Sequence, residues 1–390
     1  MRRALIALSV VLAFAVFAAP VAGAQVRKGP KGTAFYTPPA NASGKHGALI
    51  WARRQTGKDA LAGKRSKLLL YRSTAVDGSL VAVSGSVAVP KGKAPKGGWP
   101  VISYAHGTTG AADSCAPTRG YDAGKLTSYA YPLIRSWLKA GYAVVRTDYD
   151  GLGTPGVHGY LIGATEGRSV LDAVRAARKA VPKLSKRFVV AGHSQGGHAA
   201  LFAATLAPSW TPDLKLRGTV AFAPASHLGE QFPLTTQITT PGGGLGAIVG
   251  LGLRAVATVA PTVGVEGLLT PSAVALFPQT ETVCYDRLSR SDSFGGLPLN
   301  QVFQSGADLG PLVSVVSAND PETLRLKTPV QVEQGVDDGT VFKSFTDQLV
   351  SEYEANGVNV TYKTYPGVDH GGVVKAGAGS AAKFIRNRLK

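Results

Sequence analysis

A serine flanked by glycines is the first feature of the sequence that suggests chemistry: residues 192–196 read GHSQG. An apolar, strand-like run precedes this motif and an alanine-rich, helix-like stretch follows it. A serine held on a sharp strand-to-helix turn needs neighbours without bulky side chains, which explains Gly192 and Gly196. The turn would raise the Ser194 hydroxyl above a sheet and leave the Gln195 backbone N–H, at a helix N-terminus, to stabilise a developing oxyanion. We therefore predict Ser194 as a nucleophile of acyl transfer, over the alternative of a glycine-bearing turn without chemistry.

A general base must accept the proton of that serine, and in this arrangement it follows both the serine and the acid along the chain. Only two of the seven histidines, His227 and His370, come after the helix predicted behind the serine. His370 directly follows the last predicted strand, so a loop can place its imidazole over the serine. We predict His370 as the base and His227 as a structural or cap-contacting residue. His193 and His198 are too close to the serine along the chain to point toward it, and we expect them to pack or hydrogen-bond around the turn.

The acid of such a triad should stand at the end of the strand before the histidine, where Asp337 and Asp338 both occur. Its carboxylate would fix the tautomer of His370 and stabilise the imidazolium that forms as the serine is deprotonated. On residue type alone the two aspartates compete for this role.

A second oxyanion donor is expected in the loop after an earlier strand. The run SYAHGTTG at residues 103–110 fills that position, and we predict the backbone N–H of Thr108 as the donor. The alternative is a plain glycine loop.

Strands and helices alternate around these residues, which indicates βαβ units and a mainly parallel sheet flanked by helices, the α/β class. Apolar runs predict strands at residues 68–73, 80–89, 100–105, 142–147, 187–191, 216–223, 328–333 and 358–365. Helical spacing of apolar residues predicts helices at residues 131–140, 165–180, 196–207, 341–356 and 376–389.

The alternation breaks over a long apolar stretch without a strand pattern. Between residues 238 and 277 only Arg254 and Glu266 carry charge. This stretch would either pack on the core or line an acyl tunnel. We expect one sheet-based domain that an apolar cap interrupts: an N-terminal arm at 25–65, the first core part at 66–228, the cap at 229–322 and the second core part at 323–390.

The N-terminus has the layout of a secretory signal peptide. Arg2 and Arg3 precede an apolar run over residues 4–19, and small residues stand at positions 22–24. We predict a signal peptide over residues 1–24 and a secreted or cell-wall-associated protein, with an uncleaved N-terminal anchor as the alternative. No later apolar stretch is long enough to span a bilayer.

The chain is strongly basic. Its formal charge of +18 falls to +16 when residues 1–24, with their two arginines, are removed. Such a charge favours contact with anionic lipid or cell-wall surfaces. The cations are dispersed and no base-reading motif occurs, so nucleic acid is not an expected partner.

Two cysteines, Cys115 and Cys284, suggest one disulfide in an exported protein. They do not form a C-x-x-C pair and no histidines cluster, so we predict no metal site. A catalytic cysteine is not expected either, because the serine motif supplies a better nucleophile.

Three segments together resemble the secretory lipase family of fungal and actinobacterial α/β-hydrolases. They are SYAHGTTG at 103–110, DYDGLGTPG at 148–156 and GHSQGG at 192–197, and the likeness runs from about residue 65 to the end. The resemblance implies an α/β-hydrolase fold with an inserted cap over the acyl site, hydrolysis of triacylglycerols or smaller esters, and no cofactor.

The resemblance also separates the two aspartates. Asp338 stands three residues after Gly335 and three before Val341, the spacing that family members show. Asp338 is therefore the predicted acid, and Asp337 would shape the turn. The Cys115–Cys284 pairing is similar to a family bridge that ties the oxyanion region to the cap.

The expected activity is the hydrolysis of acylglycerols or other fatty-acyl esters through an acyl-enzyme, with lipids or small esters as substrates. A secreted aminopeptidase or prolyl-type peptidase could use the same triad, but it would need carboxylates to hold a substrate amine, and the apolar cap has few. A cell-wall acyltransferase would use the same acyl-enzyme with a sugar acceptor. A non-catalytic binding protein on this fold would have no need of an intact triad.

Overall fold

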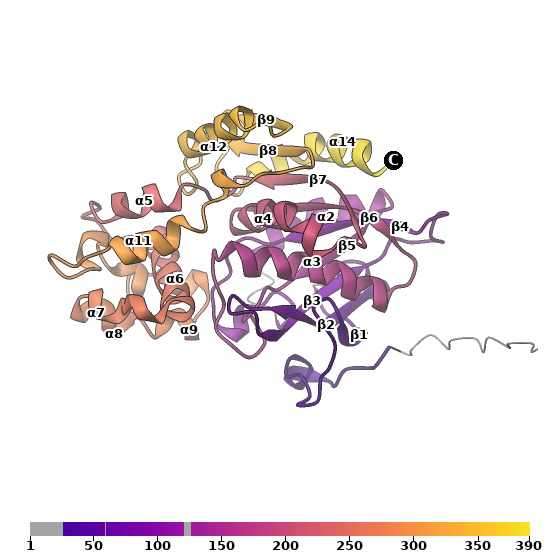
Figure 1. Cartoon of the computed structure of the whole chain (residues 1–390), viewed down its shortest axis with the longest axis horizontal. Coiled ribbons are helices and arrows are strands. Elements are labelled where there is room, and N and C mark those ends of the chain that lie inside the picture. Colours follow the sequence, from indigo (N-terminus) through magenta and orange to yellow (C-terminus); the bar gives the residue numbers. More distant parts are fainter. Residues whose placement is uncertain (1–25, 59, 121–125) are drawn as a thin grey trace, which may run out of the picture.

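The computed structural model describes residues 26–58, 60–120 and 126–390. The predicted signal peptide at residues 1–24 lies outside the described residues. The core is a sheet of nine strands in the order β1-β2-β3-β5-β4-β6-β7-β8-β9 (Figure 1). From β5 to β9 every neighbouring pair is parallel, whereas β1, β2, β3 and β5 pair antiparallel. The predicted mainly parallel α/β sheet is therefore confirmed.

The strands have the following bounds: β1 Leu49–Arg54, β2 Ser66–Thr74, β3 Leu80–Ala88, β4 Trp99–Ala105, β5 Ala143–Thr147, β6 Leu184–His193, β7 Lys215–Phe222, β8 Val330–Gly335 and β9 Val360–Tyr365. The central strands are buried over nearly their whole length, in particular β5 and β8, whose residues are all buried. Burial over the whole length of a strand fits parallel strands that are covered on both faces.

Helices cover both faces of the sheet, and the side chains of β4 point alternately toward the two helical layers. Val101 and Ala105 join one buried cluster, with residues of α3 (Gly163–Ala180) and α4 (Gln195–Trp210). Ile102 and Tyr104 point the other way and join a second cluster, with α2 (Tyr131–Lys139) and α14 (Ala378–Leu389). Successive strand residues face opposite sides, so these are two cores on the two faces of one sheet. Helices α12 (Lys343–Ala355) and α13 (Val373–Ala376) complete the layers.

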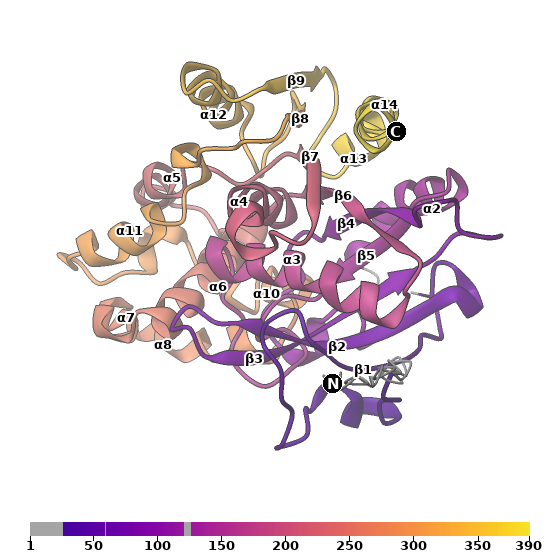
Figure 2. The same ribbon diagram turned by 45° about the vertical axis from the view of Figure 1, so that its right-hand side comes forward.

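The segment between β7 and β8 forms a separate helical layer with its own apolar core. Figures 1 and 2 both place this layer beside one end of the sheet. We call it the cap, and its helices are α5 Leu228–Thr235, α6 Gly243–Val259, α7 Val265–Leu268, α8 Pro271–Leu276, α9 Gln279–Thr282, α10 Tyr285–Leu288 and α11 Gly310–Ser317. Within the described part of the chain no single helix has the length and apolarity to cross a membrane. One pair bent by 108°, Gly243–Val259 with Pro261–Leu268, meets that test jointly.

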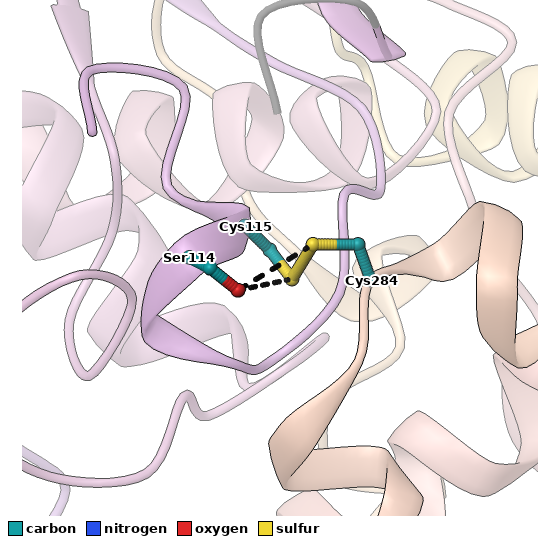
Figure 3. Close-up of a disulfide and its surroundings, with 3 residues drawn as sticks. All are labelled: Ser114, Cys115 and Cys284. Carbon is teal, nitrogen blue, oxygen red and sulfur yellow. Dashed lines mark hydrogen bonds between the residues drawn. A yellow bond between two sulfur atoms is a disulfide. The ribbon is translucent and has the colours of Figure 1, made fainter. Parts of the chain in front are cut away.

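The Cys115–Cys284 disulfide connects the core to the cap (Figure 3), with the two Cα atoms 5.4 Å apart. Two backbone contacts reinforce the junction: the Tyr285 N–H donates to the Thr109 carbonyl at 2.9 Å, and Gly110 forms a β-bridge with Cys284. The segment at residues 109–115 and the cap are thus held together by a covalent bond and by hydrogen bonds.

The N-terminal arm contributes a strand that its sequence did not lead us to predict. β1 pairs with β2 at the edge of the sheet, and its Trp51 packs with Phe35 and Leu70 in a small buried cluster. Its apolar run, LIWA at residues 49–52, is short, the strand ends in two arginines, and its flanks are rich in glycine and lysine, so a short window does not mark it as a strand.

Candidate active site

Ser194 stands in a strained turn between β6 and α4. Its φ of 57° and ψ of −123° lie where side-chain-bearing residues are rare, and such strain is typical of functional sites. Its N–H donates to the Phe222 carbonyl at 2.9 Å. A Cβ on Gly192 would lie 1.9 Å from the Gly196 oxygen, and one on Gly196 would lie 2.0 Å from the Ala105 oxygen. Both glycines of the motif are therefore required by the close approach of backbone atoms.

The His370 imidazole lies against the Asp338 carboxylate, with Nδ1 2.7 Å from Oδ2. The Thr340 and Val341 N–H groups donate to the other carboxylate oxygen, each at 2.8 Å, and the Gln334 amide donates to Oδ2 at 3.2 Å. Burial raises the pKa of Asp338. The hydrogen bond and the charge of His370, together with the two backbone N–H donors, outweigh burial and leave the pKa of Asp338 below its usual value. Asp338 is therefore a carboxylate that accepts the Nδ1 proton of His370.

The two competing aspartates differ in position. Asp338 is 4% exposed and faces His370. Asp337 is exposed, and its backbone N–H donates to the Val368 carbonyl at 3.0 Å. Only the second of the pair is placed to orient the imidazole.

His193 holds the loop that carries His370. Its Nε2 lies 2.8 Å from the His370 carbonyl oxygen, and its Nδ1 lies 2.7 Å from the Tyr129 hydroxyl. Burial and the nearby His370 lower the pKa of His193 to about 3, so the ring is neutral. A neutral ring has one N–H, which must donate to the carbonyl, and the other nitrogen accepts from Tyr129. His193 thus hydrogen-bonds beside the turn, as expected from its position next to Ser194.

The predicted oxyanion loop, residues 103–110, runs directly beside the serine turn. The Cβ position of Gly196 is 2.7 Å from the His106 oxygen, and that of Gly107 is 3.3 Å from Nδ1 of His193. Gln195 is the first residue of α4, so its N–H has no acceptor within the helix. The Thr108 hydroxyl lies 2.8 Å from the Tyr160 hydroxyl.

A cavity of about 120 Å³ opens at Ser194 and Gln195 and extends between the core and the cap. Thr340 and Val341, whose N–H groups bind Asp338, line the same cavity as Ser194. No charged side chain occurs among its described lining residues, and the cap supplies most of the apolar ones: Leu228, Phe232, Leu245, Ile248, Val249, Leu253, Val256, Leu312 and Val316.

The apolar stretch of the cap serves packing and the cavity at once. Leu251 is fully buried in the apolar core of the cap, and a Cβ on Gly250 would lie 3.0 Å from the Phe294 ring. Leu253 and Gly252, on the same helix α6, line the cavity. Helix α6 thus packs within the apolar core of the cap with one face and lines the cavity at Ser194 with another.

Sequence reasoning missed two residues beside the site, Glu166 and Tyr160. Glu166 is a buried carboxylate in α3 that accepts hydrogen bonds from Gln195 and from His198. A lone glutamate in the first turn of a helix otherwise suggests only a favourable interaction with the helix dipole, so the residue type of Glu166 did not reveal its role.

His227 is buried, with Nε2 3.2 Å from the Glu352 carboxylate. Among the described residues no three His, Cys, Asp or Glu side chains gather as metal ligands.

Comparison with known protein families gives a match to the model described as "Secretory lipase", over residues 122–390. Lipase A of Moesziomyces aphidis is 31% identical over 247 residues, which cover 59% of this chain and 50% of that protein. A Mycobacterium tuberculosis protein named "Probable inactive lipase" is 30% identical over 312 residues, which cover 75% of this chain and 67% of the relative. The chain therefore spans between half and two thirds of the length of these two relatives.

Solved structures of the same architecture include Candida antarctica lipase A in its closed state, with a TM-score of 0.76 and 22% identity. That match covers 91% of this chain and 85% of the other. The rice cell wall degrading esterase LipA from Xanthomonas oryzae matches with a TM-score of 0.72 and 19% identity, over 88% of this chain and 98% of the other. At these identities the likeness establishes the α/β-hydrolase fold.

Proposed function

We propose that this chain, which belongs to the secretory lipase family, hydrolyses fatty-acyl esters with Ser194, His370 and Asp338 as its catalytic triad. One observation carries the proposal: an uncharged, mainly apolar cavity opens at the strained serine, beside the hydrogen-bonded histidine and aspartate. A mainly apolar concave site with few polar groups suits an acyl chain.

The chemistry follows from the tautomer of His370. Because Asp338 accepts the Nδ1 proton, Nε2 carries a lone pair that can remove the hydroxyl proton of Ser194. The serine oxygen then attacks the ester carbonyl carbon, and the carbonyl oxygen becomes an anion that the N–H groups of Gln195 and Thr108 stabilise. The tetrahedral intermediate collapses, the alcohol leaves with the proton from His370, and an acyl-serine remains. Water repeats these steps and releases the carboxylic acid.

The cavity favours esters over amides of amino acids. A peptidase must hold the substrate amine with a carboxylate, and no described residue of the cavity lining is acidic. An acyl chain, in contrast, gains about 0.8 kcal/mol for each methylene it buries, or roughly fourfold in kcat/KM. We propose that its substrates are acylglycerols and other fatty-acyl esters. We also propose that the protein is secreted or associated with the cell wall.

The test combines labelling with a substrate series on protein that lacks residues 1–24 and has its disulfide formed. A fluorophosphonate should label Ser194, as located by mass spectrometry, and Ser194→Ala should lose about three or more orders of magnitude in ester turnover while staying folded. Across p-nitrophenyl esters from acetate to palmitate, kcat/KM should rise until the cavity is full. Labelling at another residue, or faster cleavage of aminoacyl anilides than of esters, would overturn the proposal, and a preference for acetate would reduce it to a short-chain esterase.

A further inference from the structure

A buried carboxylate lies behind the serine turn and takes no part in the triad. Glu166, in the first turn of α3, is 1% exposed. One of its oxygens accepts from the Leu161 N–H at 3.0 Å and from the Gln195 amide nitrogen at 2.7 Å. The other lies 2.9 Å from Nδ1 of His198. Two of the three partners can only donate, which is the pattern of an ionised carboxylate.

His198 carries the matching positive charge. Its second ring nitrogen lies 2.8 Å from the Asn319 carbonyl oxygen, so both ring nitrogens face atoms that only accept, and both must be protonated. Burial lowers the pKa of His198, but the hydrogen bond and charge of Glu166 outweigh burial and raise it above its usual value. The backbone N–H of His198 also donates to the Ser194 carbonyl, in the first turn of α4. A buried ion pair therefore lies one helical turn from the nucleophile.

The same carboxylate fixes the side chain of Gln195. The Gln195 amide nitrogen has two hydrogens, and it lies 2.7 Å from Glu166 and 2.8 Å from Nε2 of His158. His158 must accept there, because its Nδ1 lies 2.9 Å from the Asp150 carbonyl and holds the single proton of a neutral ring. Burial lowers the pKa of His158, in agreement with the neutral ring. Both hydrogens of the Gln195 amide are thus used, and its side chain has one orientation.

A second connection leads from Glu166 to the other oxyanion residue. The Leu161 N–H donates to Glu166, and Leu161, with a φ of 57°, directly follows Tyr160. The Tyr160 hydroxyl lies 2.8 Å from the Thr108 hydroxyl, and Tyr160 and Leu161 both line the cavity at the serine. One carboxylate is therefore linked to Gln195 through its side chain and to Thr108 through the adjoining segment.

We propose that Glu166 is a positioning residue for the oxyanion hole: its charge, balanced by His198, holds the residues of both donors in place before the substrate binds. This inference rests on the proposed function. Burying a charge pair is costly and does not by itself stabilise a fold. Donors that are fixed in advance do stabilise a transition state, because they need no reorganisation as the oxyanion forms.

The test compares two buried carboxylates of the same helix. Glu166→Gln keeps the size of the side chain but sets an amide N–H against one of its donors. Asp172→Asn is the matched control, since Asp172 is also fully buried in α3 and binds His46 and Ser73, neither of which lines the cavity. Both variants should lose thermal stability. Only Glu166→Gln should lose roughly 10²- to 10³-fold in kcat with little change in KM, the size of effect seen when an oxyanion donor is lost.

A second variant covers the case in which Glu166→Gln does not fold. Gln195→Met leaves the ion pair intact and removes only the side chain that Glu166 holds, and it should lower kcat without the large loss of stability. Unchanged kcat in either folded variant, or an equal fall of kcat in Asp172→Asn, overturns the positioning role. A wild-type protein that neither hydrolyses esters nor reacts with a fluorophosphonate overturns the proposed function, and this inference with it.

Discussion

The imidazole of His370 is fixed from two sides. Asp338 accepts its Nδ1 proton, and His193 donates to its backbone carbonyl. The first contact sets the tautomer and the second sets the position of the loop. The two partners differ in charge: Asp338 is held ionised by its hydrogen bonds, and His193 is kept neutral by burial.

Replacing Asp338 by asparagine should separate it from its neighbour in the sequence. Asp338→Asn turns an acceptor into a donor facing His370 and favours the wrong tautomer, so kcat for ester hydrolysis should fall by about 10⁴-fold. Asp337→Asn, on an exposed side chain, should keep kcat within about twofold. The measurement is steady-state kinetics of both variants on one ester, and an equal or reversed ranking would contradict the assignment.

The stability of the protein should depend on His106 in mildly acidic solution. Burial lowers the pKa of His106 from 6.5 to about 4, so between these values the unfolded chain binds a proton that the folded protein does not. Stability from this group is therefore lost as pH falls below 6.5, by about 1.4 kcal/mol per pH unit.

His106→Asn can keep the donor that His106 Nδ1 provides to the Gly107 carbonyl at 2.7 Å, but it cannot titrate. Urea unfolding at pH 4.5, 5.5 and 6.5 should show the wild type losing its advantage over the variant step by step, while above pH 7.5 the difference stays constant. A difference that does not change between pH 4.5 and 6.5 would contradict the buried, neutral state of His106.

At the scale of elements, helix α6 divides its faces between packing and the cavity, and one glycine allows a test of the second role. Gly252 lines the cavity, and a Cβ there would meet no protein atom within 4 Å. Gly252→Leu should therefore fill space that an acyl chain would occupy, without a clash at the Cβ. We expect kcat/KM for the palmitate ester to fall at least tenfold relative to acetate, with unfolding stability equal to or above that of the wild type.

Gly267→Leu is the control, because its Cβ position is also open but lies outside the cavity lining. It should leave the ratio of palmitate to acetate hydrolysis unchanged. If Gly252→Leu lowers kcat/KM for the palmitate and the acetate ester by the same factor, the cavity does not hold the acyl chain.

Strong local patterns explain which elements could be predicted. The central strand β6 contains the short apolar run FVVA at residues 188–191, and GHSQG carries its own backbone geometry in its glycines, so both can be read from a short window of sequence. The edge strand β1 depends on pairing with β2 and on the distant Phe35, and the buried role of Glu166 depends on α4 packing against α3. Such features arise from contacts between distant residues, which periodicity does not record.

For the whole molecule, the disulfide is a covalent tie between the cap and the core. It closes a loop with a sequence separation of 169 residues, for which chain entropy predicts a stabilisation of about 5 kcal/mol. The double variant Cys115→Ser with Cys284→Ser should therefore unfold at a lower temperature, and the wild type should match it once reduced. Thiol titration should find no free thiol in the oxidised protein and two after reduction. Equal melting temperatures with and without reductant would show that the cap is held by its other contacts alone.

The same bridge divides the proposed triad between a ring and a tail. Ser194 lies inside the closed ring from Cys115 to Cys284, whereas Asp338 and His370 follow it. Leu234, 58% exposed in the cap, offers a protease a point of attack within that ring. A single cut there opens the ring but frees no piece, so the serine and its two partners remain in one covalent molecule. Such a nicked protein would run as one band on a gel without reductant and as two bands with it, and it would keep its hydrolytic site assembled until a reductant reached the bridge.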